Sequence, residues 1–169
     1  MLDECAANPA SASACTVAAT KFLKVVEKGR GLIGLSLLLA INRAVNESLQ
    51  EKTDLEQWGE VERWSTPLET FDTGYGDCED YAIAKYVALK RLGVRDENLG
   101  IVLIETNITN ENHAILAVGA SGTRYLLNNG WGGWWGPAED VSSKNIRPLL
   151  IHDSRGGRRF TTQLASKAK

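Results

Sequence analysis

One cysteine of this sequence has neighbours that favour a reactive thiol. Cys78 lies in GDCEDYAIAKY, at the start of a helix predicted over about Glu79–Leu92. The positive end of a helix dipole favours a thiolate over a thiol, and the free backbone N–H groups of a first turn can hold an oxyanion. Cys78 is therefore a candidate nucleophile. The alternative is a small buried core residue, although the charged residues around Cys78 are unusual for a core.

Two further residues can complete a catalytic set with this cysteine. His113 begins the apolar strand HAILAVG, and Asn128 ends a later strand, so a hairpin would place them on adjacent strands. A histidine beside a thiolate acts as general base and acid, and an asparagine oxygen can accept the ring N–H and orient it. The pattern predicts a thiol-protease arrangement, with a purely structural histidine as the alternative.

Three carboxylates flank the candidate nucleophile. Asp77 is a predicted N-cap, and Glu79 and Asp80 suit the positive end of the helix dipole. So many negative charges would raise the pKa of the Cys78 thiol unless a cation neutralised them. The sequence thus places the nucleophile where two electrostatic effects oppose each other.

The elements that must position these residues change from helical to strand periodicity along the chain. Apolar spacing predicts helices over 16–28, about 32–50 and about 79–92, and strands over 99–105, 114–118, 124–128 and 146–152. The segment 53–76 is predicted to be an irregular, aromatic-rich connection. Helices followed by strands indicate an α+β fold with separate layers.

Two features of the sequence have roles that remain open. Asn42 and Asn46 lie one turn apart on the second predicted helix, where their amides either hold a neighbouring loop or face solvent. The loop GWGGWWGP (130–137) carries Trp131, Trp134 and Trp135, which either wall a substrate groove or fold back over the sheet.

Composition limits the classes of protein that the chain can belong to. Its 169 residues suit one domain, and 43% hydrophobic with 24% charged residues exclude disorder of the whole chain. The net charge of −2 gives no footprint for nucleic acid, and the longest apolar run, 31–41, is too short to span a membrane. We expect a segment over 1–15, a domain over 16–153 and a loosely ordered basic tail over 154–169.

The remaining cysteines bear on the cellular compartment. Cys5 and Cys15 are either free thiols or, as we favour, a disulfide that ties down the N-terminal segment and implies an oxidising compartment. That pairing leaves Cys78 as an unpaired thiol. The opening Met-Leu-Asp-Glu lacks a signal-peptide pattern, so an exported protein would be present here in mature form with an added initiator Met.

Four segments together carry a resemblance to a known family. The chain resembles the bacterial transglutaminase-like cysteine proteinases in WSTPLET (64–70), GDCEDYAIAKYVALKRLGV (76–94), NHAILAV (112–118) and LLNN (126–129). The likeness extends from the second predicted helix to about Asp153. It implies a papain-like, transglutaminase-like fold with N-terminal helices packed on an antiparallel sheet, a Cys-His-Asp triad and export to the periplasm or beyond.

The resemblance assigns a role to each candidate catalytic residue. Cys78 matches the nucleophile and His113 matches the general base and acid. Asn128 stands where the family has the Asp of its triad, a departure that papain-like enzymes tolerate because they use Asn in this role. The match therefore implies an active cysteine peptidase.

The resemblance also bears on the carboxylates. LapG-type members of the family bind calcium through acidic residues around the nucleophile, and the matching positions are Asp77, Glu79 and Asp80. Calcium takes six to eight oxygen ligands, so backbone carbonyls or water would have to complete such a site. Plain helix-terminal carboxylates without a metal are the alternative.

The function expected from this resemblance is cleavage of a peptide bond through an acyl-enzyme. LapG-type proteases act on a large surface adhesin and are sequestered by a membrane-bound cyclic-di-GMP receptor, so a protein substrate and such a receptor are the implied partners. Two other classes stay open: an amide or acyl transferase, and a non-catalytic peptide-binding module, which Asn128 at the triad position would favour.

Overall fold

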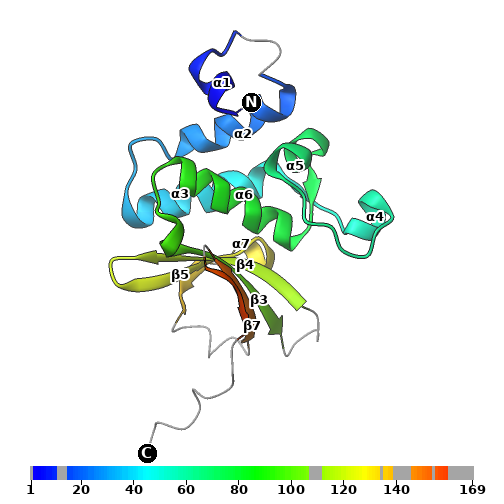
Figure 1. Ribbon diagram of the computed structural model, residues 1–169, viewed down its shortest axis with the longest axis vertical. Helices are drawn as coiled ribbons and strands as arrows, with labels where there is room; N and C mark the ends of the chain where they lie inside the picture. Colours follow the sequence, from blue (N-terminus) through cyan, green and yellow to red (C-terminus); the bar gives the residue numbers. More distant parts are fainter. Residues whose placement is uncertain are drawn as a thin grey trace, which may run out of the picture.

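The computed structural model describes residues 2–10, 15–106, 112–133, 135–138, 146–153 and 155–159. Its helices form a layer against one face of a sheet (Figure 1). The helices are α1 (Leu2–Ala7), α2 (Val17–Lys28), α3 (Gly34–Ser48), α4 (Asp54–Trp58), α5 (Pro67–Thr73), α6 (Cys78–Arg91), the 3-10 turn η1 (Asp96–Asn98) and α7 (Gly130–Gly133).

Six strands make the main sheet, in the order β6-β5-β4-β3-β7-β8, and all neighbouring strands are antiparallel. They are β3 (Leu99–Thr106), β4 (Asn112–Ala120), β5 (Thr123–Leu127), β6 (Trp135–Pro137), β7 (Ile146–Asp153) and β8 (Gly156–Arg159). Two short strands, β1 (Gln50–Glu51) and β2 (Tyr75–Gly76), pair in parallel beside the helices. The expected α+β class, with helices packed on an antiparallel sheet, is confirmed.

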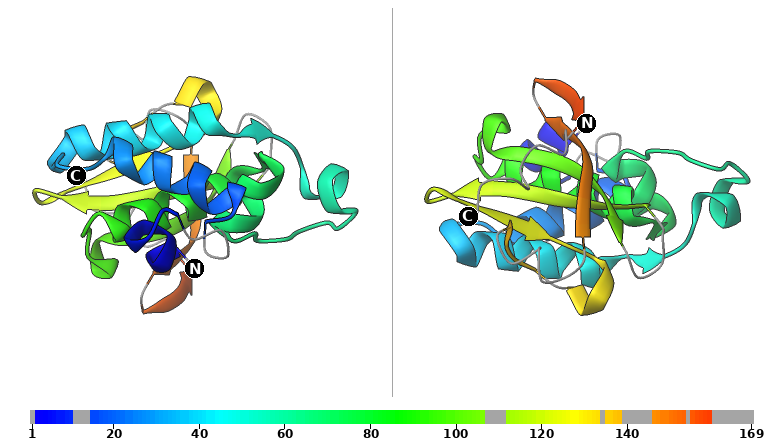
Figure 2. Two further views of the ribbon diagram at one scale, coloured as in Figure 1. Left: turned by 90° about the horizontal axis from the view of Figure 1, so that it is seen from above. Right: turned by 90° about the horizontal axis from the view of Figure 1, so that it is seen from below.

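The segment 53–76 is not irregular, and that prediction is wrong. It contains α4 and α5, and each helix begins with a capping box. Thr53 pairs with Glu56 and Thr66 with Glu69, so that each threonine accepts from an N3 backbone N–H and each glutamate accepts from the N-cap N–H. The two boxes satisfy donors that short helices would otherwise leave unpaired. Helix α4 lies out beside the body of the molecule (Figure 2).

The main core fills the space between the helices and the sheet. Phe22 of α2 and Phe71 of α5 are fully buried there, with ring centroids 5.4 Å apart in an edge-to-face arrangement. Leu116 and Leu127 contribute to this core from the sheet, and Ile115 belongs to a second cluster formed by other residues of the sheet. The strands thus alternate between two apolar surfaces, which explains their nearly continuous hydrophobic sequence.

Helix α6 is central to the layer and is closed at its C-terminal end by a Schellman motif. The N–H of Val94 donates to the carbonyl of Leu89, and the N–H of Gly93 donates to the carbonyl of Lys90, both at 3.0 Å. Gly93 adopts φ +89°, a conformation that favours glycine, as expected for the predicted helix stop. The helix packs on β4, and this places its first turn over the sheet.

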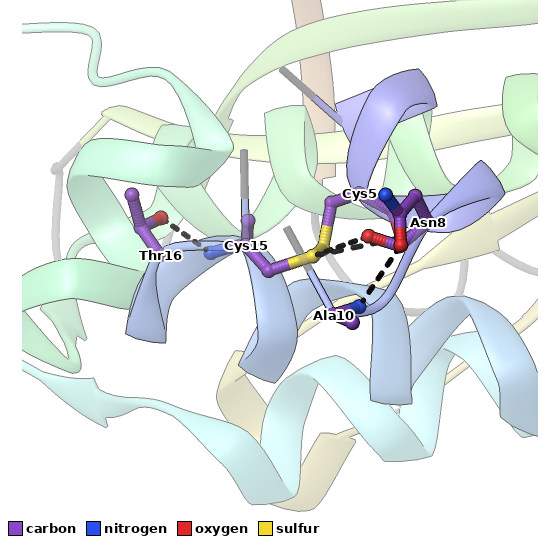
Figure 3. Close-up of a disulfide and its surroundings, with 6 residues drawn as sticks. Cys5, Asn8, Ala10, Cys15 and Thr16 are labelled. Carbon is purple, nitrogen blue, oxygen red and sulfur yellow. Dashed lines mark hydrogen bonds between the residues drawn. A yellow bond between two sulfur atoms is a disulfide. The ribbon is translucent and has the colours of Figure 1, made fainter. Parts of the chain in front are cut away.

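The N-terminal segment is tied down by a disulfide between Cys5 and Cys15 (Figure 3). Thr16 follows directly and caps α2 by accepting from the N–H of Ala19 at 3.1 Å. Cys5 is 4% exposed and packs with Ala19, so the bridge is anchored on α2. Cys78 is the free cysteine of the chain.

Within the described ranges, the structure contains no helix that is both long and apolar enough to cross a membrane.

The segment expected to form a loosely ordered tail from Ser154 contains β8, which pairs with β7. The residues of this segment after Arg159 lie outside the described ones.

Glycine at position 76 is required by close packing just before α6. A Cβ atom there would lie 2.8 Å from the Cβ of Asp80 and 3.1 Å from the Cγ2 of Thr70, both carried close to helix backbones. We expect Gly76→Ala to lower the free energy of unfolding by about 1–3 kcal/mol, because neither neighbour can move without shifting its helix. Chemical denaturation measures this change.

The matched control is Gly119→Ala, where the nearest atom to a new Cβ would be the side-chain oxygen of Asn98 at 3.3 Å. This side chain can move aside, so the loss of stability should be clearly smaller than for Gly76→Ala. Equal losses in the two variants would contradict the packing argument.

Candidate active site

Helix α6 and strand β4 meet at the sulfur atom of Cys78. The backbone N–H of Ala114 donates to Cys78 Sγ at 3.3 Å, so the sulfur lies beside the strand residue that directly follows His113. Cys78 is the first residue of α6, as predicted, and is partly buried. The contact brings the candidate nucleophile and the candidate base to one place in the fold.

His113 is held by Asn128, as the sequence pattern predicts. The two side chains lie 2.6 Å apart, from His113 Nε2 to Asn128 Oδ1. The N–H of Gly130 also donates to Asn128 Oδ1, at 3.2 Å, which identifies that atom as the amide oxygen. Because an amide oxygen only accepts, a neutral His113 carries its proton on Nε2, and Nδ1 is then its unprotonated, basic nitrogen.

Helix α3 holds the turn that carries Asn128. Asn46 Nδ2 donates to the backbone carbonyl of Asn128 at 2.9 Å, and Asn42 Nδ2 donates to that of Gly133 at 3.2 Å. Of the two roles left open by the sequence for these asparagines, the structure therefore supports the one in which they hold a neighbouring loop.

Three carboxylates gather at the N-terminal end of α6. One oxygen atom from each of Asp54, Asp77 and Glu79 lies within 4.8 Å of the others. Oxygens bound to one calcium ion, at about 2.3–2.6 Å each, can be this far apart. Asp77 occupies the predicted N-cap position, but its side chain makes no capping hydrogen bond and belongs to this cluster.

Asp54 is a residue that the sequence reasoning missed. It reaches the cluster because β1 and β2 pair in parallel with Glu51 opposite Gly76, which brings the segments that follow these two residues side by side. Asp54 is 3% exposed and accepts a hydrogen bond from the backbone N–H of Arg63. No local signal in the sequence indicates this contact, because it depends on the pairing of two-residue strands.

Asp80 has a different place from the one expected. Its Oδ1 accepts from the N–H of Ser65 at 2.9 Å and so fixes the connection between α4 and α5 to α6. Its Oδ2 is buried and makes no hydrogen bond to any described residue. Asp80 therefore lies beside the cluster of Asp54, Asp77 and Glu79, and one of its oxygens remains available.

Burial and mutual repulsion oppose the ionisation of the carboxyl groups in and beside this cluster. Burial raises the pKa of Asp77 to about 8, with the neighbouring Glu79 adding to the rise, and burial raises the pKa of Asp80 to about 7. Burial also raises the pKa of Glu79. Asp77 Oδ1 and Glu79 Oε1 are buried without a hydrogen bond to any described residue. A divalent cation with a preference for oxygen ligands fits these unpaired atoms.

The same charges act on the nucleophile. Burial raises the pKa of the Cys78 thiol well above its usual range, and the carboxylates of Glu79 and Asp77 raise it further, whereas the N–H of Ala114 lowers it. The thiol lies 3.1 Å from Glu79 Oε2 and donates to it, which stabilises the protonated form. Without a cation the positive end of α6 is thus outweighed, as the sequence suggested.

A buried lysine adds a positive charge that the sequence reasoning also missed. Lys85 lies two turns after Cys78 on α6, is 1% exposed and has its Nζ 5.9 Å from the ring centroid of Tyr81. Burial lowers the pKa of Lys85 to about 7. Burial lowers the pKa of His113 as well, and the charge of Lys85 acts in the same direction, while the bond to Asn128 opposes it.

The tryptophans of segment 130–137 do not all have a described position. Trp135 is partly buried and packs against the main core, as in the alternative in which these rings fold back over the sheet. The side chain of Trp131 and the whole of Trp134 lie outside the described residues. This segment also forms α7 and β6, so it is more regular than the loop that was predicted.

Comparison with known protein families shows which family the chain belongs to. The family model of the bacterial transglutaminase-like cysteine proteinases matches residues 4–131, well over half of the chain. The chain therefore belongs to this family of cysteine proteinases. Among curated proteins, no sequence matches it.

Solved structures show the same fold. LapG from Legionella pneumophila superposes with a TM-score of 0.71 at 21% sequence identity, covering 87% of this chain and 82% of LapG. Its calcium-bound form gives a TM-score of 0.72 at 20% identity, covering 96% and 90%. A transglutaminase structure gives 0.51 at 11% identity, covering 76% of this chain and 37% of that one. The expected transglutaminase-like fold is confirmed.

The raised pKa of the Cys78 thiol predicts how it reacts with iodoacetamide. In a chelating buffer the rate should rise only above the usual thiol pKa of about 8.5, because the thiolate is the reactive form. Calcium should shift this profile to lower pH because its charge offsets the carboxylates, and His113→Ala should shift it back toward higher pH because the thiolate loses its imidazolium partner. Since Cys5 and Cys15 form a disulfide, the alkylation rate reports Cys78 alone.

Glu47→Ala, on the exposed face of α3, serves as the control and should leave the profile unchanged. A profile of ordinary thiol titration that responds to neither calcium nor His113→Ala would contradict a nucleophile paired with a base.

Proposed function

We propose that this chain is a cysteine peptidase that cleaves a peptide bond through an acyl-enzyme on Cys78. The observation that carries this proposal is the series of contacts in which Ala114 N–H meets Cys78 Sγ at 3.3 Å and His113 Nε2 meets Asn128 Oδ1 at 2.6 Å. Membership of a cysteine proteinase family supports it. Nucleophile, base and orienting group are the parts that such chemistry requires.

In the first half of the proposed reaction, Nδ1 of His113 takes the proton of the Cys78 thiol. The thiolate attacks the peptide carbonyl carbon, a C–S bond forms, and the negative charge moves to the carbonyl oxygen. Free backbone N–H groups in the first turn of α6 are the available donors to that oxygen. His113 then gives its proton to the amide nitrogen as the C–N bond breaks, which leaves a thioester on Cys78.

In the second half, His113 takes a proton from a water molecule that attacks the thioester carbon. The C–S bond breaks, the carboxylic acid product leaves, and Cys78 regains its proton from His113. Asn128 holds the His113 ring in one orientation throughout, but it adds no negative charge that would stabilise an imidazolium. The Cys78–His113 ion pair is therefore weaker than it would be with an aspartate.

We propose that Asp54, Asp77 and Glu79, with Asp80 beside them, hold a calcium ion. When bound, the ion supplies positive charge next to the nucleophile. The buried unpaired oxygens of Asp77, Glu79 and Asp80 support this assignment, and so does the likeness to a LapG structure that is calcium-bound. The carboxylates would bind the ion, and its positive charge would offset their negative charge beside Cys78.

We propose a periplasmic or secreted location and a large surface adhesin as substrate. The Cys5–Cys15 disulfide supports an oxidising compartment, and the family resemblance supports the substrate class. On the same resemblance, a membrane-bound cyclic-di-GMP receptor is the proposed regulatory partner.

The activity test uses denatured casein and a peptide library in calcium-containing buffer, with products identified by mass spectrometry. Wild type should cleave and Cys78→Ala should not. A primary amine added to the reaction separates the transferase alternative, because an acyl-enzyme resolved by an amine incorporates it into the product. Binding of peptides without either reaction would identify a non-catalytic module and overturn the proposal.

Substitution of Asn128 by aspartate tests the third member of the set. We expect Asn128→Asp to keep the activity of wild type or to raise it by up to about tenfold, since a charged acceptor stabilises the His113 imidazolium. Asn128→Ala, as the control, should lose most of the activity. Total loss in Asn128→Asp would mean that residue 128 does not orient His113.

Calcium should remove a pH dependence of stability. Because the pKa values of folded Asp77 and Asp80, about 8 and about 7, lie above their unfolded values, the folded state binds more protons, and stability without metal should fall as the pH rises from about 4 to about 8. Calcium should raise the thermal midpoint most at about pH 8, where these groups are ionised. Thermal unfolding with calcium or with chelator measures both effects.

Asp54→Asn is the matched variant, because it removes one charge from the cluster without changing the shape of the side chain. It should weaken the stabilisation by calcium. A calcium effect of the same size in Asp54→Asn and wild type would exclude Asp54 from the site.

A further inference from the structure

The turn that carries Asn128 leaves the sheet directly after β5. Leu127 is the last residue of the strand and pairs with both Leu116 and Trp135, whereas Asn128 has no strand partner among the described residues. Asn128 is nevertheless 1% exposed, so its backbone carbonyl needs a donor from elsewhere. Asn46 of α3 supplies this donor at 2.9 Å, across 82 residues of sequence.

The other end of the same turn is held in the same way. Asn42, one helical turn before Asn46, donates to the carbonyl of Gly133 at 3.2 Å, where α7 ends. Gly133 adopts φ +73°, and a Cβ atom there would lie 3.0 Å from Asn46 Nδ2. Positive φ and close approach both call for glycine at this point. The face of α3 that carries Asn42 and Asn46 thus lies directly against the segment 128–133.

This segment meets the catalytic histidine as well as α3. The N–H of Gly130 donates to the same Asn128 oxygen that meets His113 Nε2, and a Cβ on Gly130 would lie 3.7 Å from that nitrogen. Any rotation of the Asn128 backbone would therefore displace the oxygen that orients the ring. The charges of Glu51 on β1 and Lys85 on α6 act on this ring, whereas the Asn46 amide carries no charge and influences the ring through geometry.

We propose that Asn46, assisted by Asn42, is a positioning residue that aligns Asn128 with His113 by fixing the backbone of the segment 128–133. The inference rests on the proposed peptidase function, because alignment has a kinetic consequence only where His113 acts as base. The mechanism requires a donor at position 46, and it requires no contact between Asn46 and the substrate.

The decisive variant is Asn46→Asp, which keeps the shape of the side chain but replaces its donor by a second acceptor. With calcium present, kcat should fall about tenfold with KM changed less than about twofold, because His113 is misaligned while substrate binding is untouched. Glu47→Gln, next in sequence and exposed on α3, is the control and should keep full activity. If Asn46→Asp folds poorly, Asn46→Ser replaces it.

A double-mutant cycle separates positioning from general support of the fold. In an Asn128→Ala background, which has no side chain to align, Asn46→Asp should lower kcat further by less than about twofold. Equal losses in the two backgrounds would overturn the proposal and assign Asn46 a structural role only. No loss in either background would overturn it as well.

A readout that does not need catalysis covers the case in which the proposed function fails. Nitrogen-15 spectra of His113 should show the Nε2–H tautomer in wild type, and Asn46→Asp should shift the population toward the Nδ1–H tautomer. An unchanged tautomer in Asn46→Asp would overturn the inference whatever the activity. A wild type with no peptidase activity but with this shift would overturn the proposed function alone.

Discussion

The packing of the first turn of α6 against β4 determines the geometry of the whole site. A single backbone donor, the N–H of Ala114, meets the sulfur of Cys78, and the strand neighbour of Ala114 is the candidate base, His113. Because successive residues of a strand have fixed spacing, this one contact sets where His113 stands relative to the nucleophile. The strand order then decides the third partner, since β5 lies beside β4 and Asn128 directly follows its last residue, Leu127.

The same packing buries the Cys78 thiol beside carboxylates that raise its pKa. Carboxylates from α4 and from the start of α6 lie together near the turn that carries Cys78. The parallel pairing of β1 with β2 brings the start of α4 to this place. The dipole of one helix is equivalent to about half a charge, which is too little to offset several buried carboxylates. The proposed dependence of the nucleophile on a cation thus follows from the local fold and from no feature of a substrate.

The sequence predicted the parts of this site that rest on local periodicity and failed where the parts depend on distant pairing. Helix α6 and strands β4 and β5 follow from apolar spacing, so Cys78, His113 and Asn128 were found. Helices α4 and α5 were missed because they are short, although their capping boxes are visible in the sequence. Asp54 joins the cluster only through β1 and β2, which are too short to give a strand signal.

The amide contacts from α3 have a consequence for the order of events during synthesis. The hydrogen bonds of Asn42 and Asn46 span 91 and 82 residues, and the contact between Cys78 and Ala114 spans 36. Such long-range contacts form late, after the loops between them have closed. A growing chain therefore exposes an unassisted thiol, and it gains an aligned base only when residues through Gly133 are present. The candidate site is thus assembled only in the completed fold.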